Sequence, residues 1–198
     1  MRYREAAQCM RCSKHRYWSS EIIHAAPHSL RMCPFTVLVD HREQSAWSFT
    51  DLPPKKGWKG RLFVPVSRAH MVTGDYTIAG LEDRFALERK SLEDLYGTLG
   101  QNRERFEAEL QRLQKMDFAA VVIEATLREV WCPQSFRPDW RSKLKPRAVE
   151  ATMVAWAIRY PRVHWWTVGG HREGEVRAFE VMEQFWRASQ HEEAKAQA

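Results

Sequence analysis

The 198-residue sequence has no apolar run near the roughly 18 residues that a membrane-spanning helix needs. Its N-terminal stretch contains Arg and His but lacks the apolar centre of a signal peptide. Four cysteines are too few and too unevenly placed for the disulfide framework of a secreted domain. No internal repeat is present. These absences predict a cytoplasmic protein with reduced thiols and no membrane contact.

Positive charge is in excess, but much of the excess lies at the N-terminus. The formal net charge is +6, from 31 Lys and Arg against 25 Asp and Glu. Residues 1–31 hold six of the basic residues and two of the acidic ones, so the remainder is close to neutral. Only local basic clusters can therefore support a nucleic-acid partner.

Residues 1–33 show no sustained hydrophobic period. Cys9 and Cys12 are spaced like one half of a zinc site, but a structural site needs a second well-spaced pair. Other potential ligands nearby are His15, His24, His28 and Cys33. We expect a disordered extension here, or a translation start at Met32, and no zinc.

From residue 34 to 189, strand and helix patterns alternate, which predicts one α/β domain with a mixed sheet. Expected strands are 35–40, 62–66, 76–78, 84–90, 118–126 and 163–168. Expected helices begin after Ser91 and cover 103–115, 146–160 and 175–187, with an irregular segment at 132–145. The strands at 76–78 and 84–90 are close enough in sequence for a hairpin. The polar residues 190–198 are expected to fray.

Two carboxylates and a lysine are expected to meet around the strand at 84–90. Side chains alternate along a strand, so Glu88 and Lys90 share one face while Arg89 takes the other. The hairpin brings Asp75 alongside. Carboxylate oxygens suit Mg²⁺, and a neighbouring lysine can orient a water or help to deprotonate it. This is the minimum apparatus for metal-assisted phosphodiester hydrolysis.

Structural explanations compete for the same residues. Glu88 and Lys90 could form a surface ion pair. Asp94, in the pattern Ser91-x-x-Asp94, could only cap the following helix. Asp40 and Arg42 could simply end a strand with a salt bridge. The residues alone leave these alternatives open.

Two basic clusters are interleaved with aromatic residues, around Trp58 and Trp140. Cations suit phosphate contacts, and aromatic faces suit unpaired bases. A solvated loop anchored by its tryptophan is the competing interpretation. The candidate DNA-binding residues are Lys55, Lys56, Trp58, Lys59, Arg141, Lys143 and Lys145.

Three motifs, in this order, closely resemble the nuclease domain of the XPF family, which includes the archaeal Hef nuclease, within the PD-(D/E)XK superfamily. Residues 39–43 (VDHRE) resemble its V-D-x-R-E, residues 74–76 (GDY) its G-D-Y, and residues 88–95 (ERKSLEDL) its E-R-K-x-x-x-D-L. The resemblance covers about residues 35–187. It implies a restriction-endonuclease-like fold with a mixed central sheet flanked by helices.

The resemblance also implies a DNA endonuclease that depends on Mg²⁺ or Mn²⁺. Asp75 and Glu88 match direct metal ligands, to which the carbonyl of Arg89 could add. Asp40 would lie beside the metal, through water or a second ion, and Lys90 would position the attacking water. The supporting catalytic residues implied are Arg42, Arg89 and Asp94, with Glu43 less certain.

The implied substrate is branched or flap-like, partly single-stranded DNA met in repair, recombination or replication, which would make a prokaryotic protein nucleoid-associated. Arg105 matches a family arginine and is a further candidate DNA contact, whereas Glu109 stands where a glutamine is common. A homodimer through the helix at 149–160 or at 175–187 is implied, and no helix-hairpin-helix module is expected after Arg187.

Two other functions remain as alternatives. One is a non-catalytic DNA-binding or scaffold subunit, because the family contains pseudo-nucleases that usually lose the acidic residues. The other is a junction resolvase or a restriction-like nuclease that shares the core chemistry. An enzyme is favoured because all four central residues are retained: Asp40, Asp75, Glu88 and Lys90.

Overall fold

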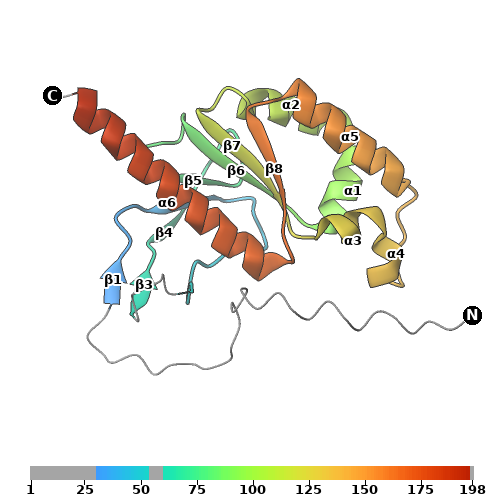
Figure 1. Cartoon of the computed structure of the whole chain (residues 1–198), viewed down its shortest axis with the longest axis horizontal. Coiled ribbons are helices and arrows are strands. Elements are labelled where there is room, and N and C mark those ends of the chain that lie inside the picture. The colour runs from blue at the N-terminus through green and yellow to red at the C-terminus, as the bar shows by residue number, and fades with distance from the viewer. Residues whose placement is uncertain (1–29, 54–59, 197–198) are drawn as a thin grey trace, which may run out of the picture.

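The computed structural model describes residues 30–53 and 60–196, in which strands and helices alternate around a mixed sheet (Figure 1). The strands are β1 (Leu30–Met32), β2 (Val37–Asp40), β3 (Arg61–Phe63), β4 (Val66–Ala69), β5 (Tyr76–Ile78), β6 (Phe85–Lys90), β7 (Phe118–Ile123) and β8 (Val163–Thr167). The helices are α1 (Leu92–Gly100), α2 (Arg103–Leu113), α3 (Leu127–Trp131), α4 (Pro133–Phe136), α5 (Pro146–Arg159) and α6 (His171–Ala196). The predicted α/β fold is confirmed.

The main sheet has six strands in the order β4-β2-β5-β6-β7-β8. β5 is antiparallel to β2 and to β6, with Tyr76 opposite Leu87, so the predicted hairpin is confirmed. The other neighbours, β2 with β4 and β6 with β7 and β8, are parallel. Parallel β7 lies between β6 and β8 and is buried on both faces, as its apolar run predicts.

A second, two-stranded sheet pairs β1 with β3 in parallel. The strand predicted at 62–66, with an interruption at Pro65, is two strands: it divides into β3 and β4 around Pro65, which has no N–H to donate to a ladder. β1 falls within the segment for which an extension was expected. The potential zinc ligands Cys9, Cys12, His15, His24 and His28, for which no zinc was expected, lie outside the described residues.

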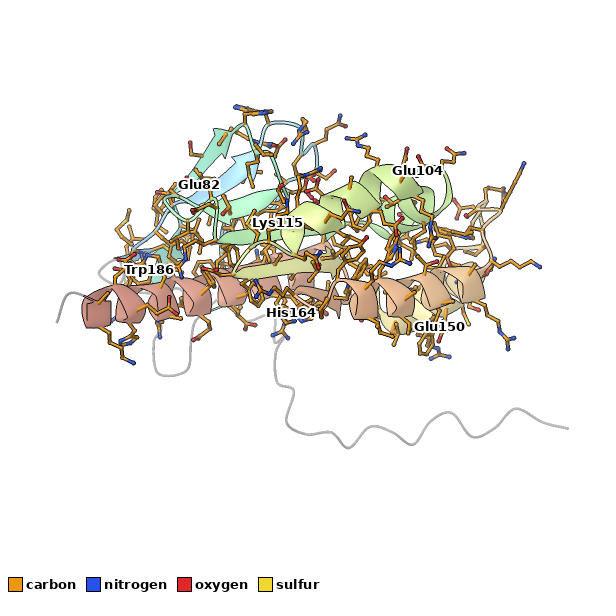
Figure 2. All side chains as sticks on the ribbon, turned by 90° about the horizontal axis from the view of Figure 1, so that it is seen from above. Glu82, Glu104, Lys115, Glu150, His164 and Trp186 are labelled. Atoms are coloured by element: carbon orange, nitrogen blue, oxygen red, sulfur yellow. The ribbon has the colours of Figure 1, made fainter. Side chains whose placement is uncertain are left out.

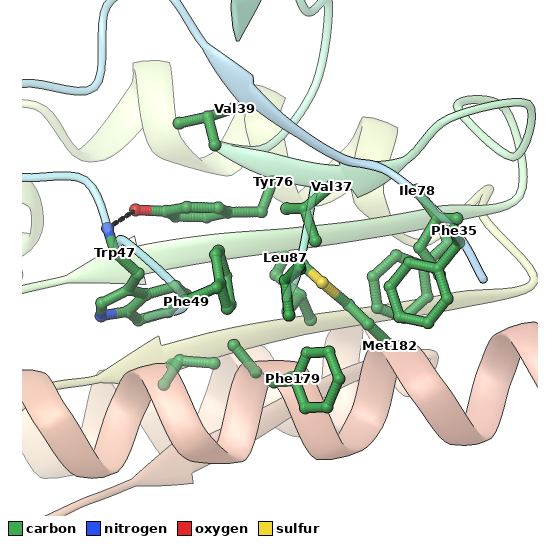
Figure 3. Packing of buried hydrophobic residues seen from close by; sticks show 14 of the residues in the cluster. Phe35, Val37, Val39, Trp47, Phe49, Tyr76, Ile78, Leu87, Phe179 and Met182 are labelled. Atoms are coloured by element: carbon green, nitrogen blue, oxygen red, sulfur yellow. Dashed lines mark hydrogen bonds between the residues drawn. The ribbon is translucent and has the colours of Figure 1, made fainter. Parts of the chain in front are cut away.

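Helix α6 covers one face of the sheet (Figure 1). Figure 3 shows Phe179 and Met182 of α6 directed towards Leu87 and Phe35. The rings of Tyr76 and Trp47 are stacked, with a centroid distance of 4.4 Å. The Tyr76 hydroxyl accepts a hydrogen bond from the Trp47 N–H at 2.9 Å. Burial of each such large apolar side chain contributes about 1.5–3 kcal/mol. The helix starts earlier than predicted and continues through residue 196, beyond the predicted end at 187.

Helices α1, α2 and α5 cover the opposite face, where Leu95, Leu110 and Trp156 pack against β7. In Figure 2, seen from above, α2 crosses the middle of the molecule near Glu104 and Lys115, while α6 runs along one long side. α1 begins at the predicted cap. The segment predicted to be irregular contains α4, and the preceding α3 begins with a capping box that the sequence interpretation missed. None of the helices in the described ranges is long and apolar enough to cross a membrane.

Candidate active site

A pocket of about 260 Å³ lies where the ends of β2, β5 and β6 meet helix α2. The strands and the turns beside them contribute Arg42, Glu43, Gly74, Asp75, Glu88 and Lys90. Helix α1 and the start of α2 contribute Thr98, Asn102, Arg105, Phe106 and Glu109. Three of the sequence motifs, far apart in the chain, therefore meet in one pocket.

Glu88 and Lys90 share the pocket face of β6, as side-chain alternation predicts. The Lys90 ammonium donates to Glu88 Oε1 at 2.5 Å and lies 4.8 Å from the centre of the Phe106 ring. Burial alone would lower the pKa of Lys90, but the charges of Glu88 and Asp75 outweigh it and raise that pKa. The lysine is therefore a protonated hydrogen-bond donor in this pocket.

Asp75 is held beside Glu88 by the backbone of β6. Its N–H donates to the Leu87 carbonyl at 2.8 Å, and its Oδ2 accepts from the Arg89 N–H at 2.8 Å. Burial, together with the nearby Glu88 charge, raises the pKa of Asp75 well above its ordinary value. Burial also raises the pKa of Glu88, although Lys90 opposes the shift. The carboxylates of Asp75 and Glu88 thus lie close together, and Lys90 balances only part of their negative charge.

Gly74 makes this arrangement possible. Its φ of +74° lies in the left-handed region, and a Cβ there would stand 3.0 Å from the Leu87 carbonyl oxygen. Its N–H donates to Glu109 Oε1 at 2.8 Å, which ties the Asp75 turn to α2. Glu109 is also paired with Arg112. The sequence analysis noted only that Glu109 stands where the family commonly has a glutamine. It did not predict the contact of Glu109 with Gly74.

The donor set suits a small hard cation. No group of three or more His, Cys, Asp and Glu side chains within residues 30–53 and 60–196 could hold a metal ion. Mg²⁺, however, keeps several waters and is commonly held by one or two carboxylates together with substrate phosphates. Asp75 and Glu88 supply such a pair, and a bound cation would favour the ionised forms of both side chains, whose pKa values are raised chiefly by burial. The residues therefore fit the implied metal.

Asp40 is held by hydrogen bonds from Arg42 and from the backbone of Met71. Its Oδ1 accepts from the backbone N–H and the Nε of Arg42, and its Oδ2 accepts from Arg42 Nη2 and the Met71 N–H. These hydrogen bonds, the one from the Arg42 side chain above all, hold the pKa of Asp40 well below its usual range despite burial. Asp40 does not line the pocket among the described residues. It instead anchors Arg42, which does line it, and metal ligation by Asp40 stays a prediction.

Asp94 and Arg89 lie outside the pocket wall. Ser91 Oγ accepts from the Asp94 N–H at 3.1 Å and donates to Asp94 Oδ2 at 2.8 Å, which confirms a capping role for Asp94. Arg89 points to the α6 face of the sheet, as predicted, and pairs there with Glu43 and Glu124. Glu124 was not singled out from the sequence, although a glutamate that directly follows a buried strand is a usable signal.

The candidate DNA-binding residues are divided among separate places. Arg105 lines the pocket. Arg141, Lys143 and Lys145 are exposed on the segment between α4 and α5 and do not line it. Lys55, Lys56, Trp58 and Lys59 lie outside the described residues. The basic rim of the pocket is therefore formed by Arg42 and Arg105.

Comparisons with known proteins agree with this geometry. The family model of the ERCC4 domain matches residues 39–174, more than half of the 198 residues. The chain belongs to the ERCC4 domain family. The ERCC4 match begins at Val39, the first residue of the first motif, and it confirms the resemblance to the XPF-type nuclease domain.

Two solved structures share the ERCC4 domain's fold. XPF from Aeropyrum pernix is 21% identical, with a TM-score of 0.50, and the match covers 78% of this chain and 61% of that chain. XPF from Aeropyrum pernix in complex with DNA is 19% identical, with a TM-score of 0.50, and the match covers 78% and 66%. This chain thus spans less than two thirds of the XPF chain in the first structure and about two thirds in the second. A comparison with curated proteins found no match.

Proposed function

We propose that this ERCC4 domain is a metal-dependent endodeoxyribonuclease that hydrolyses phosphodiester bonds. The observation that supports the proposal is the convergence of Asp75, Glu88 and Lys90 in one pocket, where the two carboxylates have raised pKa values. Membership of a nuclease-domain family supports the same reaction. DNA is the proposed partner, as the XPF structure solved with DNA suggests.

Asp75 and Glu88 would hold Mg²⁺ or Mn²⁺, and the Arg89 carbonyl could add a ligand. The bound ion would supply Lewis-acid stabilisation of the charge that develops on the phosphate. Lys90, kept protonated by its neighbours, would hold the attacking water through its N–H groups rather than remove its proton directly. The guanidinium groups of Arg42 and Arg105 would contact neighbouring phosphates at the pocket rim.

The preferred substrate is proposed to be branched or flap-like DNA, partly single-stranded, as met in repair, recombination or replication. A junction-resolvase or restriction-like preference is the alternative within the same chemistry. Purified protein should be tested on flap, splayed-arm, four-way junction and plain duplex DNA. Each substrate should be offered with Mg²⁺, with Mn²⁺ and with excess chelator. Cutting should require the metal and should be fastest on a substrate that contains a branch.

Two variants and one control locate the activity. Asp75→Asn and Glu88→Gln should abolish cutting and retain DNA affinity, because each removes a metal ligand and leaves the basic rim intact. Glu104→Gln, an exposed acid on the same helix as Arg105, should cut like the wild type. Undiminished cutting in chelator would contradict the metal requirement. Tight DNA binding without cutting by the wild type would instead favour a non-catalytic DNA-binding subunit.

A further inference from the structure

The Glu124 carboxylate gathers contacts from three distant parts of the chain on the α6 face of the sheet. Its two oxygens accept from Arg89 Nε at 2.8 Å and Arg89 Nη2 at 2.6 Å. Trp47 Nε1 donates to Oε1 at 2.8 Å, and His171 Nδ1 lies 2.8 Å from the same oxygen. Glu124 therefore joins β6, the segment after β2 and the start of α6.

Burial makes this arrangement demanding. The Glu124 and Arg89 side chains are 6% and 9% exposed, and a buried charge is costly unless it is paired and hydrogen-bonded. The start of α6 packs closely on Trp47, since a Cβ at Gly174 would stand 3.1 Å from the Trp47 ring. The bidentate pair of Glu124 and Arg89 is thus held in one geometry on the α6 face of the sheet, opposite the pocket.

The backbone of β6 connects this pair to the pocket. Arg89 lies between Glu88 and Lys90, whose side chains point into the pocket, and its N–H holds Asp75 Oδ2 at 2.8 Å. The Glu124 N–H donates to the Lys90 carbonyl at 2.8 Å. Anchoring the Arg89 side chain from the α6 face therefore fixes the backbone that presents the pocket residues.

We infer that Glu124 is a positioning residue for the pocket on the opposite face of the sheet and acts through Arg89. The inference rests on the proposed nuclease function, because that function assigns metal binding and cleavage to the pocket. Groups that orient metal ligands without touching the metal commonly matter by about 10–100-fold in metal affinity or activity. Loss of the Glu124 charge should therefore weaken the site more than it weakens the fold.

Glu175 offers a matched control within the same chain. It is also a buried glutamate, accepting from the Phe49 N–H at 2.5 Å and from Ser48 Oγ at 3.0 Å, and it pairs with Arg172. These contacts tie α6 to the segment at 48–50, and none of them involves β5 or β6. Glu124→Gln and Glu175→Gln thus remove the same charge from similar surroundings, but only the first contacts the strand of the pocket.

The experiment compares both variants of the full chain with the wild type. Thermal melts report stability, and titration calorimetry with Mn²⁺ reports metal affinity without DNA. Single-turnover cleavage and DNA affinity are measured separately. Glu124→Gln should lose about 10–100-fold in cleavage rate, in Mn²⁺ affinity or in both, and should keep its DNA affinity. Glu175→Gln should melt at a lower temperature but keep both the rate and the Mn²⁺ affinity.

Several outcomes separate the explanations. Wild-type rate and Mn²⁺ affinity in Glu124→Gln, or equal losses in Glu175→Gln, would overturn the inference. Failure of the wild type to cut would count against the proposed function, while the Mn²⁺ comparison would still test Glu124. If Glu124→Gln does not fold, Glu124→Asp keeps the charge but shortens its reach, and it should show the same losses. If neither variant folds, Glu124 acts only in the core and the inference fails.

Discussion

Asp40 and Arg42 form a two-point ion pair at the end of β2, with Nε–Oδ1 and Nη2–Oδ2 distances of 2.7 and 3.0 Å. Asp40 is buried, whereas the Arg42 side chain is 62% exposed. Arg42 Nη2 also donates to the Met71 carbonyl at 2.8 Å. The pair therefore fixes a pocket-lining guanidinium against the end of the sheet, although its carboxylate stays out of the pocket.

Asp40→Asn should destabilise the protein at neutral pH by about 1–3 kcal/mol, because buried hydrogen bonds to a charged acceptor are lost. The folded pKa of Asp40 is depressed, so its contribution is present above the unfolded value of about 3.9 and disappears as pH falls through the folded pKa. Urea unfolding across a pH series should show that the difference in unfolding free energy between wild type and variant becomes smaller below about pH 4. Asp83→Asn, at an exposed turn position, is the control. If this difference in unfolding free energy does not change with pH, Asp40 does not have a depressed pKa in the folded protein.

Arg105→Ala should weaken DNA binding and reduce its salt dependence. Arg105 lines the pocket, so loss of one phosphate contact should lower the log–log slope by about 0.7–0.9. Arg103→Ala is a matched control on the same helix, because Arg103 instead donates to Thr152 at 3.1 Å and lies over the Trp156 ring. Fluorescence anisotropy at several salt concentrations gives both slopes. If the two variants show the same salt dependence of DNA binding, Arg105 makes no phosphate contact of its own.

The outward face of α5 carries an apolar stripe that is centred on Val154 and Ile158, which are 56% and 76% exposed. Ala151 and Ala155 beside them are exposed too, while Trp156 on the other face is buried. An exposed stripe of this kind on a helix is typical of a contact with another helix. A second copy of the chain is the proposed occupant, since the resemblance implies a homodimer through this helix.

Ile158→Glu should therefore convert a dimer into a monomer, because it places a charge at the centre of the proposed contact. Size-exclusion chromatography with light scattering measures the mass over a range of protein concentrations. Ala157→Glu adds the same charge about 100° away around the helix and should leave the dimer intact. A monomeric wild type at all concentrations would contradict the proposed dimer.

The strand that carries Glu88 and Lys90 and the helix that follows it were predictable because their signals are local. Alternation along β6 placed both side chains on one face, and Ser91 marked the start of α1. The hairpin needed only a short connection, at residues 79–83, between two apolar segments. These signals span a few residues each, so no knowledge of distant contacts was required.

The remainder of the site depends on contacts between distant residues. Trp47 and Glu124 are 77 positions apart in the sequence, and no local sequence pattern predicts their hydrogen bond. Glu109 reaches the Gly74 N–H across 35 positions, so only its departure from glutamine could be noticed. The parallel pairing of β1 with β3 is equally non-local. Long-range pairing of this kind is decided by the packing of the whole domain rather than by propensity.

Lys90→Arg gives the sharpest separation of chemistry from structure. The Lys90 side chain is 14% exposed, with Glu88 and the Phe106 ring both in contact, so a larger planar guanidinium can enter only by displacing the water that the ammonium should hold. The variant keeps the charge and should fold and bind DNA. Its cleavage should fall by about 100-fold or more, because a misplaced attacking water can cost about that factor in rate. Lys115→Arg, at an exposed position labelled in Figure 2, is the matched control. Single-turnover cleavage at saturating enzyme, alongside thermal melts, distinguishes the two effects. A near-normal rate for Lys90→Arg would remove the lysine from the mechanism and leave it only as the ion-pair partner of Glu88.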